Sequence, residues 1–265
     1  MTSSELQIDV SAQIDKLTAF LQQTFAHAKK THAVIAISGG IDSALSLALL
    51  SLALPKENIW PILLPYANQD MVDANTLLDH LEIPLQNRKT LNIASMVEGA
   101  CTALQITNED LLRKGNIMAR MRMIALFDYA KSKEALVVGT ENKSEHHLGY
   151  FTRFGDEASD VEPLLTLYKT QVRQLASHLQ LPEVFLQKAP SAGLWAEQSD
   201  EAELGFNYEL ADQVLVRLID QQKAPATIMH EFAKTDHAQV QKVLARVEAV
   251  RFKLQVPYVN ENLNI

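Results

Sequence analysis

The sequence is poor in cysteine, with only Cys101 among 265 residues. A single thiol excludes an internal disulfide, a CxxC redox pair and a zinc cluster built from thiolates. Cys101 lies in an apolar helical stretch, residues 94–104, so we expect a buried and unreactive thiol rather than a nucleophile. The chemistry of this protein must therefore come from other residue types.

Positive charge and long apolar runs are also scarce. Lys and Arg number 24 against 32 Asp and Glu, a net charge of −8, which argues against a nucleic-acid binder. The longest apolar stretch, residues 41–54, contains Asp42 and three serines, and falls short of the roughly 18 residues of a membrane span. The N-terminus has acidic Glu5 and Asp9 and no basic segment, so it does not look like a secretory signal. We expect a cytoplasmic protein that binds neither nucleic acid nor a membrane.

Apolar residues make up 47% of the chain, enough for a substantial core. Short apolar runs alternate with helical patterns over the first half. The predicted strands are residues 33–37, 58–64, 86–93 and 135–138, and the predicted helices are residues 6–30, 42–53, 69–81 and 108–132. Such alternation predicts an α/β fold with a doubly wound parallel sheet flanked by helices.

After Thr140 the pattern changes. Residues 141–190 are expected to be rich in loops, with one helix near residues 170–179, and further helices are predicted over residues 207–222, 226–234 and 237–252. No linker or repeat separates the two parts. We therefore expect one domain, residues 1–265, with a helical C-terminal region.

The strongest signal is an eight-residue segment between the first predicted strand and the next helix. It comprises Ala36, Ile37, Ser38, Gly39, Gly40, Ile41, Asp42 and Ser43. Adjacent glycines leave backbone N–H groups uncovered, serines add hydroxyl donors, and the following helix presents its positive dipole end. This combination predicts a phosphate site, and Asp42 beside it suggests a bridging Mg²⁺. The alternative is a plain strand-to-helix turn with Asp42 as a cap.

The segment is neither a Walker A loop nor a dinucleotide fingerprint, because no GKS/T and no GxGxxG occurs. SGGxDS after a strand resembles the pyrophosphate loop of the N-type ATP pyrophosphatases. That superfamily cleaves ATP between the α and β phosphates and adenylates a carbonyl or carboxylate oxygen. The loop alone does not distinguish its members, which include GMP synthetase, asparagine synthetase, NAD synthetase and tRNA-modifying enzymes.

A second group of polar residues follows on the long predicted helix and the strand after it. Residues 117–130 are apolar on nearly every side, which predicts a helix buried all round in a core or an interface. Arg120 and Arg122 on it require anionic partners, either a structural Asp or Glu or a phosphate or carboxylate ligand. Thr140 and Glu145 follow the strand at 135–138, and carboxyl ends of parallel strands are where such sheets bind ligands.

Further segments make the resemblance specific. GNxxARxRM, GTxNxSE, GYFTxxGD, LYKT, PSAGLW and QSDExELG occur here in the order found in NAD synthetases, over about residues 36–205. The chain resembles the ammonia-dependent form of that family. The resemblance implies an adenine nucleotide alpha-hydrolase-like, Rossmann-like fold.

The resemblance also implies roles for individual residues. Residues 36–43, with Thr140, Lys169 and Ser191, would bind ATP; Asp42 and Glu145 would be the Mg²⁺ ligands; Arg120, Arg153, Asp160, Phe252 and Lys253 would bind deamido-NAD. Asp42, Lys169 and Asp160 would be catalytic, with Asp160 facing the ammonium. Arg153 stands where the family commonly has Lys. Of a His-Lys-Arg segment common in the family, this chain keeps only Lys253, next to Phe252.

The implied reaction amidates deamido-NAD (nicotinic acid adenine dinucleotide) with ammonia and ATP, through an acyl-adenylate, to NAD, AMP and pyrophosphate. A homodimer joined through residues 117–130 is expected, and 265 residues leave no room for a glutaminase domain. A tRNA-modifying enzyme is the rival within the superfamily, but the net charge of −8 and the lone Cys101 disfavour it. A nucleotide-sensing module without catalysis is the other rival, and it would not need both Asp42 and Glu145.

Overall fold

A computed structural model describes residues 4–107, 109–191, 193, 195 and 198–258. Its centre is a parallel sheet in the order β3-β2-β1-β4. The strands are β1 (Ala33–Ala36), β2 (Ile59–Leu63), β3 (Lys89–Thr90) and β4 (Leu136–Val138). Ala33 pairs with Ile59 on one side and Leu136 on the other, so β1 is a central strand. The predicted doubly wound parallel sheet is confirmed.

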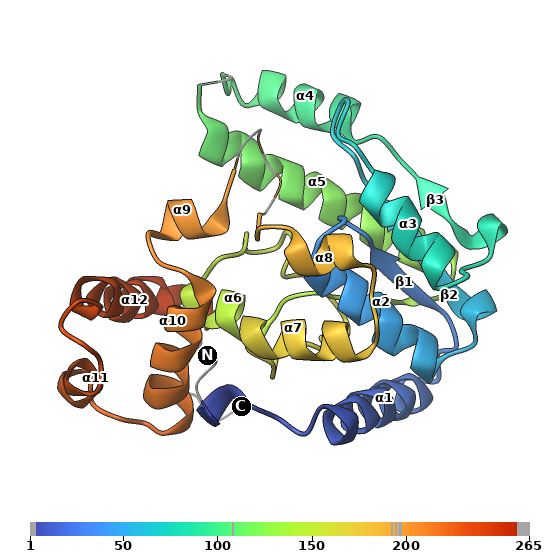
Figure 1. The fold of residues 1–265 in the computed structure, drawn as a ribbon. Helices are drawn as coiled ribbons and strands as arrows, with labels where there is room; N and C mark the ends of the chain where they lie inside the picture. Colours follow the sequence, from blue (N-terminus) through green and yellow to red (C-terminus); the bar gives the residue numbers. More distant parts are fainter. Residues whose placement is uncertain (1–3, 108, 192, 194, 196–197, 259–265) are drawn as a thin grey trace, which may run out of the picture.

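One face of the sheet is covered by helices from two separate parts of the chain, residues 10–80 and 169–187 (Figure 1). These are α1 (Val10–His27), α2 (Ile41–Ala53), α3 (Val72–His80), α7 (Lys169–His178) and α8 (Glu183–Gln187). The apolar stripe of α1, at helical spacing, is buried as the sequence predicts, with Leu21 fully enclosed. It packs against α2, which packs in turn against α7.

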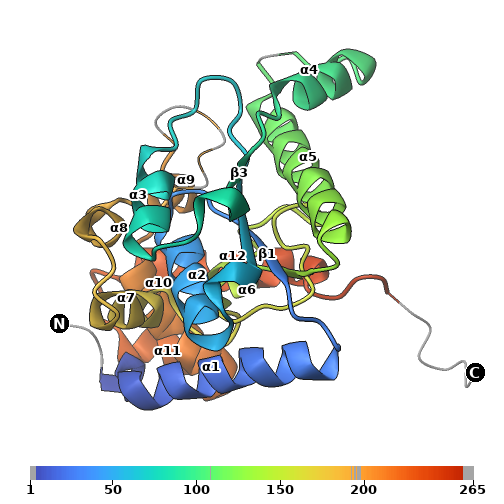
Figure 2. The ribbon, with the colours of Figure 1, turned by 90° about the vertical axis from the view of Figure 1, so that its right-hand side faces the viewer.

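The opposite face is covered by α4 (Ala94–Ala103) and α5 (Leu111–Ser132), as Figure 2 shows from the side. Cys101 is buried on α4 among apolar neighbours, as expected. Helix α5 is not buried all round within this chain, so of the two predicted alternatives the core is excluded and the interface stays a prediction. Arg120 and Asp128 are exposed and Ile124 is 47% exposed, because only one side of α5 meets the sheet and α4.

A third apolar cluster lies beside the sheet, at the left of Figure 1. It is formed by α10 (Tyr208–Leu215), the π-helical turn η4 (Val216–Asp220), α11 (Pro225–Glu231) and α12 (His237–Val250), which is followed by η5 (Arg251–Lys253). α6 (Lys143–Leu148) and α7 pack against α10. The predicted helical C-terminal region is thus present and touches the elements that follow β4.

The structure departs from the predicted elements in two places. Of the strand expected over residues 86–93, only β3 is a regular strand, since η3 (Leu85–Asn87) occupies its start, although Leu91 N and Ile93 N still donate to Leu63 O and Pro65 O, both at 2.9 Å. Residues 141–190 hold three helices, α6, α7 and α8, where one was expected, because α6 and α8 are only five or six residues long and lack a readable period. Short turns η1 (Ser4–Leu6) and η2 (Lys56–Asn58) and the helix α9 (Asp200–Leu204) complete the fold. Among the described residues, no helix is both long and apolar enough to cross a membrane.

Candidate active site

The candidate site lies at the carboxyl ends of β1 and β4. From β1 the chain continues to β2 on one side, whereas β4 lies on the other, so the order reverses between β1 and β4. Open α/β sheets bind ligands at such a switch point, because the loops leaving the two strands diverge and leave a crevice. Residues 37–40 follow β1 and residues 139–142 follow β4.

The anion loop, residues 36–43, turns from β1 into α2 as predicted. Gly39 has φ +82°, a left-handed conformation that favours glycine. Gly40 is the N-cap of α2 and brings no side chain to the first N–H groups of the helix. Ser43 Oγ lies 3.2 Å from Ser38 Oγ and donates to Gly40 O at 3.0 Å, which braces the turn. The result is a helix N-terminus with uncovered donors, suited to an anion.

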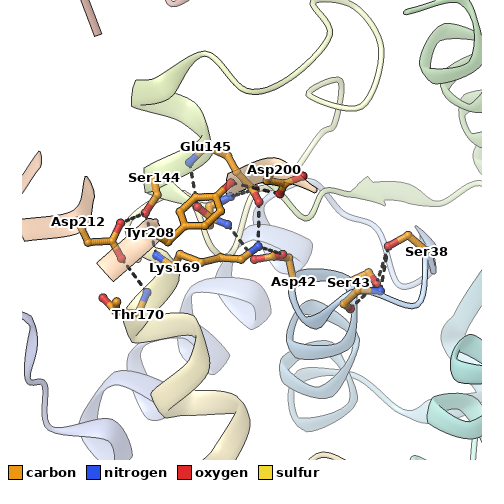
Figure 3. Close-up of polar contacts among 12 residues, drawn as sticks. Ser38, Asp42, Ser43, Ser144, Glu145, Lys169, Thr170, Asp200, Tyr208 and Asp212 are labelled. Atoms are coloured by element: carbon orange, nitrogen blue, oxygen red, sulfur yellow. Dashed lines mark hydrogen bonds and ion pairs between the residues drawn. The ribbon is translucent and has the colours of Figure 1, made fainter. Parts of the chain in front are cut away.

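Beside the anion loop, four residues form what we call the lysine–carboxylate cluster: Asp42, Asn142, Glu145 and Lys169. Figure 3 labels Asp42, Glu145 and Lys169 of this cluster. Lys169 Nζ donates to Asp42 Oδ2 at 2.6 Å and to Glu145 Oε1 at 3.0 Å. The Lys169 side chain is only 3% exposed. The fold therefore brings together three residues that the sequence predicted for the site. Lys169 contacts both Asp42, 127 positions away in the chain, and Glu145, and the two carboxylates share its ammonium.

Asn142 joins the two carboxylates and was missed by the sequence reasoning. Its Nδ2 donates to Asp42 Oδ1 at 2.8 Å, and its Oδ1 accepts from Glu145 N at 3.0 Å. Its own N–H donates to Glu145 Oε2 at 3.3 Å, which completes a capping box at the start of α6. The Asn-x-x-Glu spacing of residues 142–145 is a sequence signature of that motif and could have revealed it.

Burial and mutual repulsion perturb the cluster electrostatically. Burial, and then the charge of Asp42, raise the pKa of the Glu145 carboxyl to about 8, while Lys169 opposes the shift. The pKa of Lys169 is raised, because attraction to both carboxylates outweighs the burial that disfavours its charge. Two carboxylates held this close require a cation between them, and Lys169 supplies it.

Gly139, at the end of β4, has a separate reason to be glycine. A Cβ there would stand 1.7 Å from Glu162 Oε1. Glu162 is held in place by Ser159 Oγ, which donates at 2.7 Å, and by Glu141 N, which donates at 3.2 Å. Burial raises the pKa of Glu162 to about 8. The missing side chain at Gly139 thus leaves room for the Glu162 carboxyl beside the loop after β4. Thr140 lies in this loop and is half-buried.

Four of the five residues expected to bind deamido-NAD gather around residues 149–155. Arg120 Nε donates to Arg153 O at 3.3 Å, and the Arg153 guanidinium lies 5.3 Å from the centre of the Phe252 ring. Lys253 Nζ donates to Gly149 O and Phe151 O, both at 2.6 Å. Lys253 therefore fixes the loop that carries Arg153.

Asp160, predicted to face the ammonium, contacts the backbone of β4. Its Oδ2 accepts from Val137 N at 2.8 Å, so the carboxylate serves the edge of β4. Ser191 is exposed, and its Oγ accepts from Gly193 N at 3.1 Å. No contact of these two residues tests the roles predicted for them, which stay predictions.

Arg122 and Lys188 show two further sets of contacts. Arg122 donates to Leu64 O at 3.1 Å and to Gln69 Oε1 at 2.9 Å, both uncharged, so an anionic ligand for Arg122 stays a prediction. Lys188 was not singled out from the sequence. Its Nζ donates to Asp73 at 2.6 Å and to Gly39 O at 3.3 Å, which places a cation against the anion loop.

Comparison with known proteins identifies the family. The family model described as NAD synthase matches residues 13–257. The chain belongs to the NAD synthase family. It is 38% identical to an NH(3)-dependent NAD(+) synthetase of Fusobacterium nucleatum over 97% of this chain and 98% of that protein. It is 41% identical to the protein of the same name from Thermococcus sibiricus over 84% and 87%.

Solved structures of the NAD synthase family share the whole architecture. An NMN synthetase of Francisella tularensis superposes with a TM-score of 0.80 at 30% identity, covering 96% of this chain and all of that one. An NH3-dependent NAD synthetase of Campylobacter jejuni gives a TM-score of 0.77 at 29% identity with the same coverage. The family match decides against the tRNA-modifying and sensing alternatives, and it makes the chain a ligase by membership.

The donor set of the lysine–carboxylate cluster fits a magnesium ion. Oxygens of Asp42 and Glu145 converge on one point, where they share the Lys169 ammonium. Within the described residues, no group of three or more His, Cys, Asp or Glu side chains is arranged to hold a metal. Two carboxylates suffice for Mg²⁺ when substrate phosphates and water complete its shell.

Proposed function

We propose that this chain catalyses the ATP-dependent amidation of deamido-NAD with ammonia, giving NAD, AMP and pyrophosphate. One observation supports the proposal above all: Lys169 bridges Asp42 and Glu145 directly beside a glycine-rich helix N-terminus, in a chain that matches the NAD synthase model over residues 13–257. A cation, two carboxylates and an anion site are the parts that ATP cleavage requires. The curated relatives at 37–41% identity carry the same activity in their names.

In this proposal the anion loop binds the β and γ phosphates of ATP. Backbone N–H groups of α2 and the hydroxyls of Ser38 and Ser43 are the donors. Lys169, Thr140 and Ser191 complete the ATP site. Lys169 neutralises charge that develops on the departing pyrophosphate, once its ammonium has turned from the two carboxylates toward ATP.

Asp42 and Glu145 would hold Mg²⁺, which supplies Lewis-acid polarisation of the phosphates when it is bound. Lys169 occupies the point between the two carboxylates in the present arrangement. Its four-carbon side chain is flexible enough to turn its ammonium toward ATP while the carboxylates take the metal.

The residues around 149–155 would bind deamido-NAD through Arg120, Arg153, Phe252 and Lys253. Holding the nicotinate carboxylate in line with the α phosphorus converts a bimolecular attack into an intramolecular one. The carboxylate oxygen then forms an acyl-adenylate and releases pyrophosphate. Ammonia attacks the activated carbon and displaces AMP, and Asp160 is proposed to face the incoming ammonium.

Amidation of nicotinic acid mononucleotide is the second candidate. The observation that favours it is the NMN synthetase of Francisella tularensis, which shares the fold at a TM-score of 0.80. The curated NAD synthetases are more similar in sequence, at 38–41% against 30%. Deamido-NAD is therefore proposed as the preferred substrate.

We further propose a homodimer in the cytoplasm. The exposed side of α5 offers Ile124, and Leu111 and Leu112 are exposed at its start. Large apolar side chains in such positions are suited to contact with a second copy. Sedimentation at micromolar concentration tests the pairing, and an active monomer would contradict it.

The deciding experiment measures pyrophosphate release and nicotinamide formation with ATP, Mg²⁺ and ammonium. Deamido-NAD and nicotinic acid mononucleotide are supplied in parallel, and the ratio of kcat/KM values ranks the two candidates. Glutamine free of ammonia replaces ammonium in a third arm, where the 265-residue chain should be nearly inactive. No product with either dinucleotide or mononucleotide would overturn the proposed function.

A further inference from the structure

Asp212, on α10, is a buried carboxylate to which no role has been assigned so far. Its exposed fraction is 0%. Thr170 N, on α7, donates to its Oδ2 at 2.8 Å, and Ser144 Oγ, on α6, donates to its Oδ1. One carboxylate therefore ties together three helices of the region that follows β4 (Figure 3).

The same contacts reach the backbone of Lys169. Ser144 Oγ accepts a hydrogen bond from Lys169 N at 2.8 Å while it donates to Asp212. Lys169 and Thr170 are the first two residues of α7, where N–H groups have no partner within the helix. Asp212 and Ser144 together satisfy both, and a negative charge at a helix N-terminus is further stabilised by the dipole.

We propose that Asp212 is a positioning residue for Lys169. Through Thr170 N and Ser144 Oγ it fixes the backbone from which the Lys169 side chain reaches Asp42 and Glu145. A lysine has four rotatable side-chain bonds, so the ammonium can be placed accurately only if the start of the side chain is fixed. The inference depends on the proposed function in one respect, namely that Lys169 binds the phosphates of ATP.

The burial of Asp212 has an electrostatic cost. Burial raises its pKa to about 6, although Ser144 and Thr170 oppose the shift. Because the folded-state pKa exceeds that of the unfolded chain, the contribution of this group to stability is lost as pH rises through about 6. Asn would avoid that cost at neutral pH and caps helices about as well as Asp does, so Asp212→Asn tests the hydrogen bonds separately from the charge.

The test compares Asp212→Ala with Asn87→Ala at a temperature where both variants are folded. D212A leaves Thr170 N and Ser144 Oγ without their partner, and we expect kcat to fall at least tenfold. The KM for ATP should rise, while the KM for deamido-NAD stays within twofold of wild type. Asn87 is the matched control, since it is 3% exposed and donates to three backbone carbonyls at the start of β2. N87A should lower stability but keep kcat within twofold.

Two further variants separate positioning from packing. Asp212→Asn can still accept from Thr170 N and turn its amide toward Ser144 Oγ, so kcat should return to within threefold of wild type. Ser144→Ala removes only a hydroxyl, is a mild change should D212A fail to fold, and should lower kcat at least threefold. In a Lys169→Ala background, D212A should cost no more than another twofold, because the side chain it positions is gone.

Three results would overturn the inference: equal kcat for D212A and N87A, an unaffected S144A, or independent losses from D212A and K169A. A wild-type chain that makes no product would instead contradict the proposed function.

Discussion

The anion loop and the lysine–carboxylate cluster lie side by side, but they draw on different lengths of chain. The loop takes all of its donors from residues 36–43, in one turn between β1 and α2. The cluster needs α2 for Asp42, α6 for Glu145 and α7 for Lys169, and the Asp42–Lys169 bond spans 127 positions. A local site can be recognised from eight letters, whereas the cluster exists only once three helices are packed. We therefore expect activity to fall further when Lys169 or Asp42 of the cluster is replaced than when the backbone of the anion loop is strained by a substitution at Gly39.

The largest loss is expected from Lys169→Ala. It leaves Asp42 and Glu145 facing each other without their cation and removes a donor aimed at the phosphates. We expect kcat for pyrophosphate release to fall about a hundredfold or more. Lys143→Ala is the matched control, because Lys143 pairs with Asp220 at a side-chain exposure of 17% and lies outside the cluster. A K169A enzyme as active as K143A would break the comparison.

Asp42→Asn should come next, because Asp42 belongs to both parts. The substitution keeps the shape and the bond from Asn142 but removes a charge from the proposed Mg²⁺ ligand. Turnover should fall at least tenfold, with an unchanged melting temperature. The control is Asp73→Asn on α3, which loses an ion pair with Lys188 at the end of α8. Normal turnover by D42N would show that the metal is held elsewhere.

Gly39→Ala probes the loop alone. A Cβ has room, its nearest neighbour being Asp73 Cβ at 3.5 Å, but alanine is strained at φ +82°. We expect about 1–2 kcal/mol less stability in urea unfolding and several-fold weaker ATP binding by calorimetry. Gly99→Ala is the control, and a change in stability of the opposite sign is expected from it. Gly99 lies inside α4 with nothing within 4 Å of an added Cβ, so the variant should gain about 0.5–1 kcal/mol.

The smallest effect is expected from Lys253→Gln, at the edge of the site. Lys253 holds the backbone at Gly149 and Phe151, and one glutamine amide can replace only part of that. The KM for deamido-NAD should rise two- to fivefold, about the worth of one hydrogen bond, with the KM for ATP unchanged. Arg251→Gln, exposed in the same turn, should change neither constant. A shift in both constants would place Lys253 closer to ATP than proposed.

Much of the fold could be predicted because buried strands and helices show a pattern of apolar residues in the local sequence. Strand β1 lies between two neighbours and is buried on both faces, so it appears as the continuous apolar run at residues 33–37. The short helices α6 and α8 show no such pattern in the sequence. Five or six residues hold less than two helical turns, and these helices are stabilised by contacts with distant elements.

Asp212 lies between these cases. It occupies the apolar stripe of α10, with Tyr208, Ala211 and Leu215 at helical spacing, and a charge in such a stripe indicates a buried partner. The pattern could have revealed that Asp212 matters. It could not have named Ser144 and Thr170, because nothing in the spacing relates α10 to the starts of α6 and α7.

Local patterns along the chain were enough to predict the sheet and the anion loop, and the family resemblance grouped Asp42, Glu145 and Lys169. That the two carboxylates share one ammonium, that Asn142 joins them and that Asp212 contacts Ser144 and Thr170 became visible only in the folded chain. The two kinds of feature differ in the range of the interactions that form them. Strand burial and helix dipoles act over a few neighbouring residues, whereas a buried ion pair forms only when packing excludes water from groups that are far apart in the chain.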